Sequence, residues 1–158
     1  MTTPAEAAAA IWSRAPLLPA TAAPLHMLPG AILREPIAAT RDQPPFDRVT
    51  MDGIAIASSA FAEGRRAFRI AGTQAAGSPR QTLTSPDTCI EVMTGAVLPD
   101  GCDCVVPVER IVIDDGVATI AEDFPASARL NVHQRGLDCR AGDALLERGT
   151  RIGAPELA

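Results

Sequence analysis

Lysine and tyrosine are absent from this chain of 158 residues, and aromatic residues make up only 3% of it. A row of stacking aromatic side chains for single-stranded nucleic acid is therefore not expected. All 14 basic residues are arginine and the formal net charge is −5, so the overall charge does not favour nucleic acid or anionic membranes. A local arginine patch remains open. The 47% of hydrophobic residues is enough to build a packed, mostly aliphatic core.

The usual spacing of metal ligands is also missing. The chain has four cysteines and two histidines, and no cysteine pair has the C-x-x-C spacing. This pattern argues against a zinc site and favours reduced, partly buried thiols.

No apolar run approaches the roughly 20 residues that span a bilayer. The first ten residues lack the basic segment of a secretory signal, so the cytoplasm is the expected location.

Short apolar segments separated by Gly and Pro turns make up most of the chain. We expect strands over 67–71, 89–93 and 104–108, with Glu91 pointing outward, and a hairpin that turns at Asp114-Asp115-Gly116. A helix is expected over 3–13, and the last residues resemble a helix start that is cut off, as in a fragment of a longer protein. Strands and helices do not alternate, so the predicted fold is α+β and mostly β.

Several polar side chains stand beside glycine. Asp52 precedes Gly53 and Thr94 precedes Gly95, and glycine allows backbone N–H groups to approach a ligand closely. Each polar residue also has an ordinary explanation: Asp52 and Thr94 can form simple turns, Glu109 a solvated strand end, and Asp138 a turn cap. The residues alone therefore indicate acidic loops, compatible with an oxyanion or a metal, on a β-rich domain.

Four segments, taken together and in order, resemble the motifs of the molybdopterin molybdenumtransferases (the MoeA and gephyrin E-domain family). They are PPFDRVTMDGIA at 44–55, EVMTGAVLPDGCDCVVPVE at 91–109, NVHQRGLD at 131–138 and GDALLERGT at 142–150. The pair MDG and MTGA is the most specific. The chain departs from the family pattern at four positions. Ile54 replaces tyrosine, Val108 glutamine, His133 arginine and Leu137 glutamate.

The resemblance implies a fold like the N-terminal region of MoeA, with a β-rich lobe inserted in an elongated mixed domain. The expected domains are 1–45 with 128–158, incomplete at its C-terminal end, and 46–127 as the inserted lobe. In this family a nucleotide- and pterin-binding α/β domain and a small β-barrel follow, so the chain alone is expected to be incomplete and inactive.

The resemblance also implies an enzyme that inserts molybdate into adenylylated molybdopterin, with Mg²⁺ and with release of AMP. A homodimer is expected for the intact protein, with molybdopterin adenylyltransferase as a possible partner. The residues carried over as catalytic are Asp52, Thr94 and Asp138, and those carried over as substrate-binding are Gly53, Gly95, Glu109 and Arg135.

Each of these residues has an expected role. Asp52 and Asp138 could hold the metal or orient its water. Thr94 and the Gly95 amide could bind an oxyanion, and Arg135 could offer a fork to molybdate or phosphate.

Two other functions stay open. A non-catalytic dimerisation or scaffold module of the same fold would explain the departures at Ile54, His133 and Leu137. A free-standing oxyanion-binding protein would need measurable molybdate affinity by itself. The retained MDG and MTGA motifs favour the enzyme.

Overall fold

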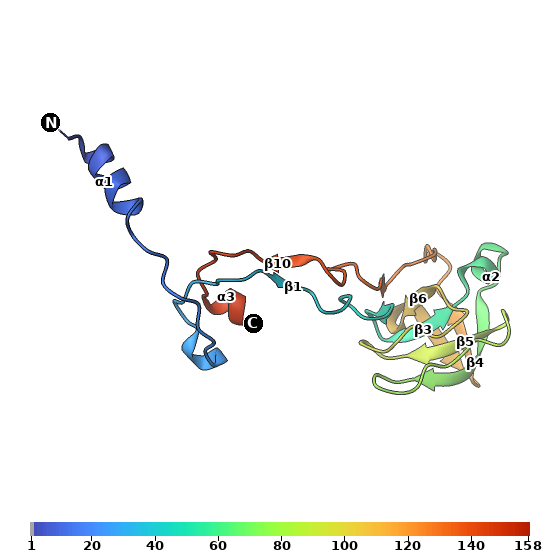
Figure 1. Ribbon diagram of the computed structural model, residues 1–158. Helices are drawn as coiled ribbons and strands as arrows, with labels where there is room; N and C mark the ends of the chain where they lie inside the picture. Colours follow the sequence, from blue (N-terminus) through green and yellow to red (C-terminus); the bar gives the residue numbers. More distant parts are fainter. Residues whose placement is uncertain (1) are drawn as a thin grey trace. The chain divides into compact units, whose positions relative to one another are not determined.

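The computed structural model describes residues 2–158, which form two compact units. One comprises the chain up to Ile37 together with Ala144–Ala158, and the other is Ala38–Asp143 (Figure 1). The division therefore falls at other residues than the boundaries expected at 45/46 and 127/128. Backbone hydrogen bonds explain why the flanking segments join the second unit: Gly136 donates to Pro44 and Asp138 donates to Gln43. The expected inserted domain, with its boundaries, remains a prediction.

The first unit contains the helices at the two ends of the chain. Helix α1 (Pro4–Trp12) begins at a capping box, in which the Thr3 hydroxyl accepts from the Glu6 N–H and the Glu6 carboxylate accepts from the Thr3 N–H. This confirms the expected helix. The other elements are η1 (Leu25–Met27), α3 (Ala154–Leu157) and strand β10 (Ala144–Leu146). Strand β10 pairs with β1 (Ile37–Ala38), which spans the boundary between Ile37 and Ala38. Within residues 2–158, no helix combines the length and apolar character that crossing a membrane requires.

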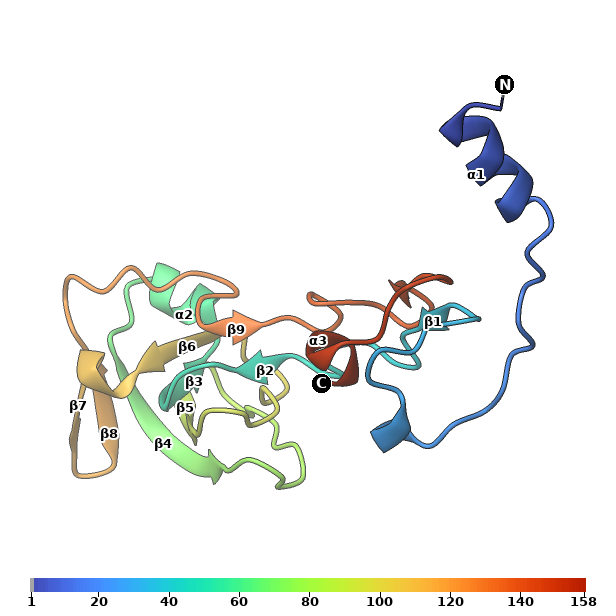
Figure 2. The same ribbon diagram turned by 90° about the vertical axis from the view of Figure 1, so that its left-hand side faces the viewer.

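A six-stranded sheet dominates the second unit (Figure 1). Its strands, in spatial order, are β6 (Cys104–Pro107), β3 (Gly53–Ile56), β5 (Thr88–Val92), β4 (Ala67–Gln74), β8 (Val117–Ile120) and β7 (Ile111–Asp114). Strands β4 and β5 are parallel, and the other neighbours are antiparallel. The hairpin β7–β8 turns where the sequence predicts it. A second, two-stranded sheet joins β2 (Arg48–Val49) to β9 (Val132–His133), which lie side by side in Figure 2.

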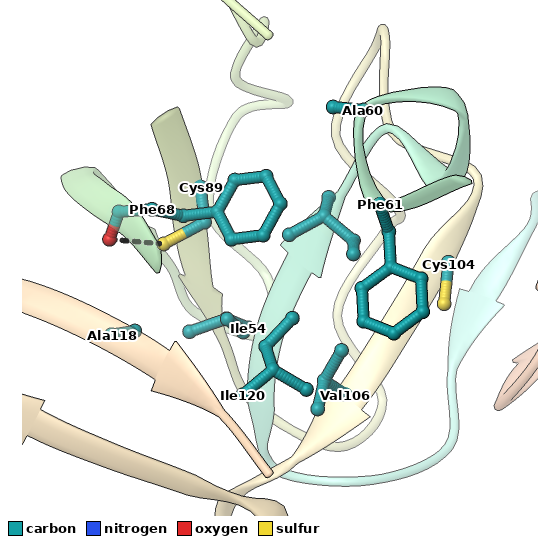
Figure 3. Close-up of a cluster of buried hydrophobic side chains, with 10 residues drawn as sticks. Ile54, Ala60, Phe61, Phe68, Cys89, Cys104, Val106, Ala118 and Ile120 are labelled. Atoms are coloured by element: carbon teal, nitrogen blue, oxygen red, sulfur yellow. Dashed lines mark hydrogen bonds between the residues drawn. The ribbon is translucent and has the colours of Figure 1, made fainter. Parts of the chain in front are cut away.

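Side chains on both faces of β3 are buried, which creates two hydrophobic clusters. Successive side chains of a strand point to opposite faces, so Ile54 and Ile56 enter one cluster and Ala55 the other. Figure 3 shows the first cluster, in which the rings of Phe61 and Phe68 lie among aliphatic side chains. Because the strand is covered on both sides, its position is determined by packing on each face.

A short helix, α2 (Ser58–Ala62), lies between β3 and β4, where the sequence analysis expected none. Its first turn is held by Asp103, whose carboxylate accepts from the Ser58 N–H and from the Ser58 hydroxyl, both at 2.7 Å. Asp103 is 45 residues away in the chain. A cap supplied from such a distance leaves no local sequence signal, which explains why α2 was missed.

Three of the four cysteines are buried in the second unit. Cys89, Cys102 and Cys104 are free thiols inside the two clusters, and Cys139 is half-buried. Burial raises the pKa of Cys89 and of Cys102 to about 12, and that of Cys104 to about 11. These thiols therefore stay protonated at neutral pH, in agreement with the interpretation of reduced, partly buried cysteines.

Thiol labelling should separate Cys139 from the other three cysteines. We expect a maleimide at pH 7 to modify Cys139 first in the folded chain, because the buried thiols are inaccessible and only the thiolate reacts quickly. Labelling of Cys89, Cys102 and Cys104 should require denaturant. Peptide mass spectrometry over a labelling time course measures the order. Rapid labelling of Cys102 without denaturant would contradict the packing described here.

Candidate functional site

The side chains of Asp52 and Thr94 meet beside the large sheet. Asp52 precedes β3 and Thr94 follows β5, and these antiparallel neighbours pair Gly53 with Val92. The pairing places the residue before Gly53 and the residues after Val92 at the same end of the two strands. The Thr94 N–H and the Thr94 hydroxyl both donate to Oδ1 of Asp52, at 2.6 and 2.7 Å. Thus MDG and MTGA form one structural unit.

Gly53 lets the backbone of Asp52 pass close to β6. Gly53 is buried with φ +156, and a Cβ there would collide with the carbonyl oxygen of Val106. The carbonyl oxygen of Asp52 in turn accepts from the Val108 N–H at 2.9 Å. The structure therefore gives Gly53 a packing role, and its expected part in binding substrate remains a prediction.

The amide of Gly95 donates to a protein acceptor. It bonds the carbonyl oxygen of Val49 in β2 at 2.9 Å, while both donors of Thr94 bond Asp52. The two groups expected to bind an oxyanion are thus engaged within the chain. Their hydrogen bonds determine the conformation of the turn after β5. The MTGA segment therefore has a structural role, which is to hold Asp52 and this turn in place.

Asp52 lines a cavity of about 200 Å³. Its other lining residues are Gly53, Glu91, Val92, Met93, Val108, Ile111 and Ile113. Glu91 is held by the Thr73 hydroxyl, which donates to its Oε2 at 3.0 Å. The cavity thus combines two carboxylates with aliphatic side chains. Glu91 was expected to point outward, but it is half-buried and shares its face of β5 with Cys89 of the first hydrophobic cluster. It borders the cavity at the edge of that face.

The hydrogen bonds to Asp52 lower the pKa of its carboxyl. The main cause is the Thr94 hydroxyl, followed by the Thr94 N–H, and both stabilise the ionised form. Asp52 is exposed, so hydrogen bonding and not burial determines its state. Asp52 therefore stays an anion well into the acid range.

Asp138 lies in a different cluster, with His133. The ring Nε2 of His133 is 2.8 Å from Oδ1 of Asp138, and the ring Nδ1 is 3.4 Å from Nη2 of Arg48. Arginine cannot accept a hydrogen bond, so Nδ1 is the acceptor in this contact and Nε2–H donates to Asp138. Arg48 was not singled out in the sequence. Arg48 lies opposite His133 in the β2–β9 pair, so it could have been identified only after that pairing was known.

Arg135 holds the loop that follows β9 through two hydrogen bonds. Its Nε donates to Asp42 at 2.7 Å and its N–H donates to Asp47 at 2.8 Å. The pKa of Asp42 is lowered, first by the Ala141 N–H and then by Arg135. Arg135 is thus partly used in the fold, and its role as a fork for an oxyanion remains a prediction.

Strand β2 contacts both groups of candidate residues, the Asp52–Thr94 pair and the Asp138–His133 pair. Val49 bonds the turn that contains Gly95, and the same strand pairs with β9, which carries His133.

The remaining candidate, Glu109, is exposed on η2 (Val108–Arg110) and does not line the cavity. Within residues 2–158, no three His, Cys, Asp or Glu side chains are grouped so as to hold a metal ion.

Comparison with known proteins identifies the family. Residues 2–158 match the family described as "MoeA N-terminal region (domain I and II)". The chain belongs to this family. The resemblance carried by the four motifs is thereby confirmed, and so is the MoeA-like, mostly β fold.

Two curated relatives carry the name molybdopterin molybdenumtransferase. The protein from Synechocystis is 44% identical over 126 residues, which cover 80% of this chain and 32% of the relative. The protein from Staphylococcus epidermidis RP62A is 35% identical over 133 residues, which cover 82% of this chain and 31% of the relative. This MoeA N-terminal chain thus spans about a third of the length of these relatives.

Two solved structures titled molybdopterin biosynthesis MoeA protein, from Pyrococcus horikoshii, share the fold. One has a TM-score of 0.75 at 28% identity and covers 85% of this chain and 35% of its own. The other has a TM-score of 0.78 at 25% identity and covers 85% of this chain and 36% of its own.

Replacing Gly53 by alanine should destabilise the MoeA N-terminal chain more than the same change at an open glycine. Gly77 is the matched control, because it also has a positive φ but a Cβ there would meet nothing within 4 Å. We expect Gly77→Ala to cost about 1 kcal/mol of unfolding free energy from backbone strain. Gly53→Ala should cost about 2 kcal/mol more, from the collision with β6. Urea unfolding measures both, and equal costs would contradict the close approach.

The Asp52–Thr94 pair should make a pH-dependent contribution to stability. Because the folded-state pKa of Asp52 is lowered, the stabilisation is complete above the ordinary aspartate pKa and is lost as the pH falls through the lowered value. Thr94→Val should raise the pKa of Asp52 toward its ordinary value, without a full return because the N–H donor remains. A ¹³C NMR titration of the Asp52 carboxyl measures the change, with Thr119→Val on an exposed strand position as control. An unchanged Asp52 pKa in Thr94→Val would refute the assignment.

Proposed function

We propose that this chain is the N-terminal part of a molybdopterin molybdenumtransferase, which inserts molybdate into adenylylated molybdopterin and releases AMP. Membership of the MoeA N-terminal family and the names of the curated relatives support the reaction class. The observation that carries the proposal is the Asp52–Thr94 pair, which places an ionised carboxylate on the lining of a cavity.

The chemistry suits such a site. Displacing AMP from a phosphoanhydride depends on positioning and on charge stabilisation more than on a protein nucleophile. Both donors of Thr94 bind Oδ1 of Asp52, and the described residues supply no hydrogen bond to Oδ2. The role proposed for Asp52 is to hold a ligand or a water molecule through that second oxygen. Its lowered pKa keeps the carboxylate ionised for this role.

Magnesium fits the proposal in a limited way. Mg²⁺ in phosphate chemistry is commonly held by one or two carboxylates, with substrate phosphates and water completing its shell. Asp52 offers one such carboxylate, and Asp138 offers a second that is already paired with His133. When bound, the ion would neutralise charge on the phosphate groups. Asp52 is therefore the ligand proposed for the ion, and Asp138, which lies in a different cluster, keeps its expected role only as a further candidate.

The proposal also includes protein parts beyond this chain. A nucleotide- and pterin-binding α/β domain would supply the rest of the active site, and the intact protein would act as a homodimer in the cytoplasm. Molybdopterin adenylyltransferase, which would supply the adenylylated substrate, is the proposed functional partner.

The departures from the family motifs leave the Asp52–Thr94 pair intact, which weighs against the scaffold alternative. Ile54 is fully buried in the first hydrophobic cluster, so this change alters packing. His133 still contacts Asp138, and Arg48 supplies a cation beside it. Leu137 is 65% exposed, so it removes a carboxylate from the surface. The chemical group on which the enzyme proposal depends, the Asp52 carboxylate with its two Thr94 donors, is therefore unchanged by these departures.

The proposal is tested on the natural gene product, purified from its own cells. We expect molybdate-dependent release of AMP from adenylylated molybdopterin, and a turnover reduced by about 100-fold in Asp52→Asn, by analogy with the loss of one preorganised electrostatic contact. Asp114→Asn, at an exposed hairpin position, is the matched control and should keep full turnover. Circular dichroism should show that both variants are folded.

Unchanged turnover in Asp52→Asn would reject the role proposed for Asp52. A natural gene product that forms dimers but releases no AMP in the presence of molybdate would reject the enzyme assignment and favour the scaffold function. Molybdate binding without any turnover would favour the free-standing oxyanion-binding protein.

A further inference from the structure

We infer that Thr94 is a positioning residue for Asp52 and does not itself bind the oxyanion. The effect of Thr94 on catalysis rests on the proposed function, whereas its effect on the conformation of Asp52 does not. The inference replaces the expectation that Thr94 and the Gly95 amide form an oxyanion site, because the donors of both residues have protein acceptors.

Both hydrogen-bond donors of Thr94 are used within the chain. A threonine has one backbone N–H and one hydroxyl proton to donate. In this chain both go to the same atom, Oδ1 of Asp52, at 2.6 and 2.7 Å. Hydrogen bonds to a carboxylate are among the stronger ones in proteins, so their loss to bind a ligand would be costly. Thr94 therefore has no donor left for an oxyanion while it holds Asp52.

The threonine is itself held in place. Its neighbours in the turn are anchored on both sides, since Met93 donates to the Gln74 carbonyl and Gly95 donates to the Val49 carbonyl. Gln74 is fully buried and lies at the end of β4. The donors of Thr94 thus belong to a rigid turn between two strands.

Asp52 needs such a partner because packing does not restrain its side chain. The residue is exposed, whereas its carbonyl oxygen is fixed by the Val108 N–H. An exposed aspartate on a fixed backbone still has several accessible χ1 rotamers, and selecting one of them costs conformational entropy. The two bonds from Thr94 select one rotamer before any ligand binds. They leave Oδ2 without a donor among the described residues, on a residue that lines the cavity.

The structural content is tested by NMR on this chain alone. The Hα–Hβ couplings of Asp52 report its χ1 populations. We expect one dominant rotamer in the wild type and in Thr94→Ser, which keeps both donors. Thr94→Val keeps only the N–H, so a second rotamer should appear, whereas Thr119→Val should change nothing. A single Asp52 rotamer in Thr94→Val would overturn the inference.

The catalytic consequence is tested on the natural gene product. Thr94→Ser should retain activity within about threefold, and Thr94→Val should lower kcat by roughly 10- to 100-fold, because small misplacements of a reacting group are costly. The KM for molybdate should change little, since Thr94 does not contact molybdate. A rise in the KM for molybdate at unchanged kcat would overturn the inference in favour of direct oxyanion binding.

A double-mutant cycle separates the two roles further. In an Asp52→Asn background Thr94→Val should have much less effect, because residues that act through one another are not additive. The same loss in both backgrounds would mean that Thr94 acts independently. If the wild-type protein releases no AMP, the proposed function fails, and the χ1 measurement still decides whether Thr94 positions Asp52.

Discussion

Strand β3 lies between β5 and β6, and side chains on both of its faces are buried. Its close approach to β6 at Gly53 leaves no room for a side chain there. This constraint determines where Asp52 can be, because the residue before Gly53 must leave the sheet at that point and bond Val108 through its carbonyl oxygen. The candidate site is therefore a consequence of how three strands pack.

Two of the departures from the family motifs have identifiable structural surroundings. Ile54, which stands in place of a tyrosine, follows Gly53 in β3 and points into the core. His133 stands in place of an arginine, but the β2–β9 pairing brings Arg48 beside it. Neighbouring residues contact both side chains, Ile54 through hydrophobic packing and His133 through hydrogen bonds to Arg48 and Asp138.

The parts of the fold that local chemistry controls were predictable. The capping box of α1 and the β7–β8 hairpin depend on residues within a few positions of each other, so their sequence signals are direct. Helix α2 was not predictable, because its N-cap is Ala57 and its first N–H is bonded by the distant Asp103. The backbone bonds between 43–44 and 136–139 also leave no local signal, because they join segments that are far apart in the sequence.

The sequence by itself determined the family, through four ordered motifs, and the residue types that could carry chemistry. Only the tertiary structure decided how those residues are grouped: Asp52 with Thr94 at a cavity shared with Glu91, and Asp138 with His133 and Arg48. The physical reason is that a motif specifies side chains along the chain, whereas hydrogen-bond partners depend on strand pairing between distant segments. The donors of Thr94 and Gly95 illustrate this, since their acceptors lie 42 residues or more away in sequence.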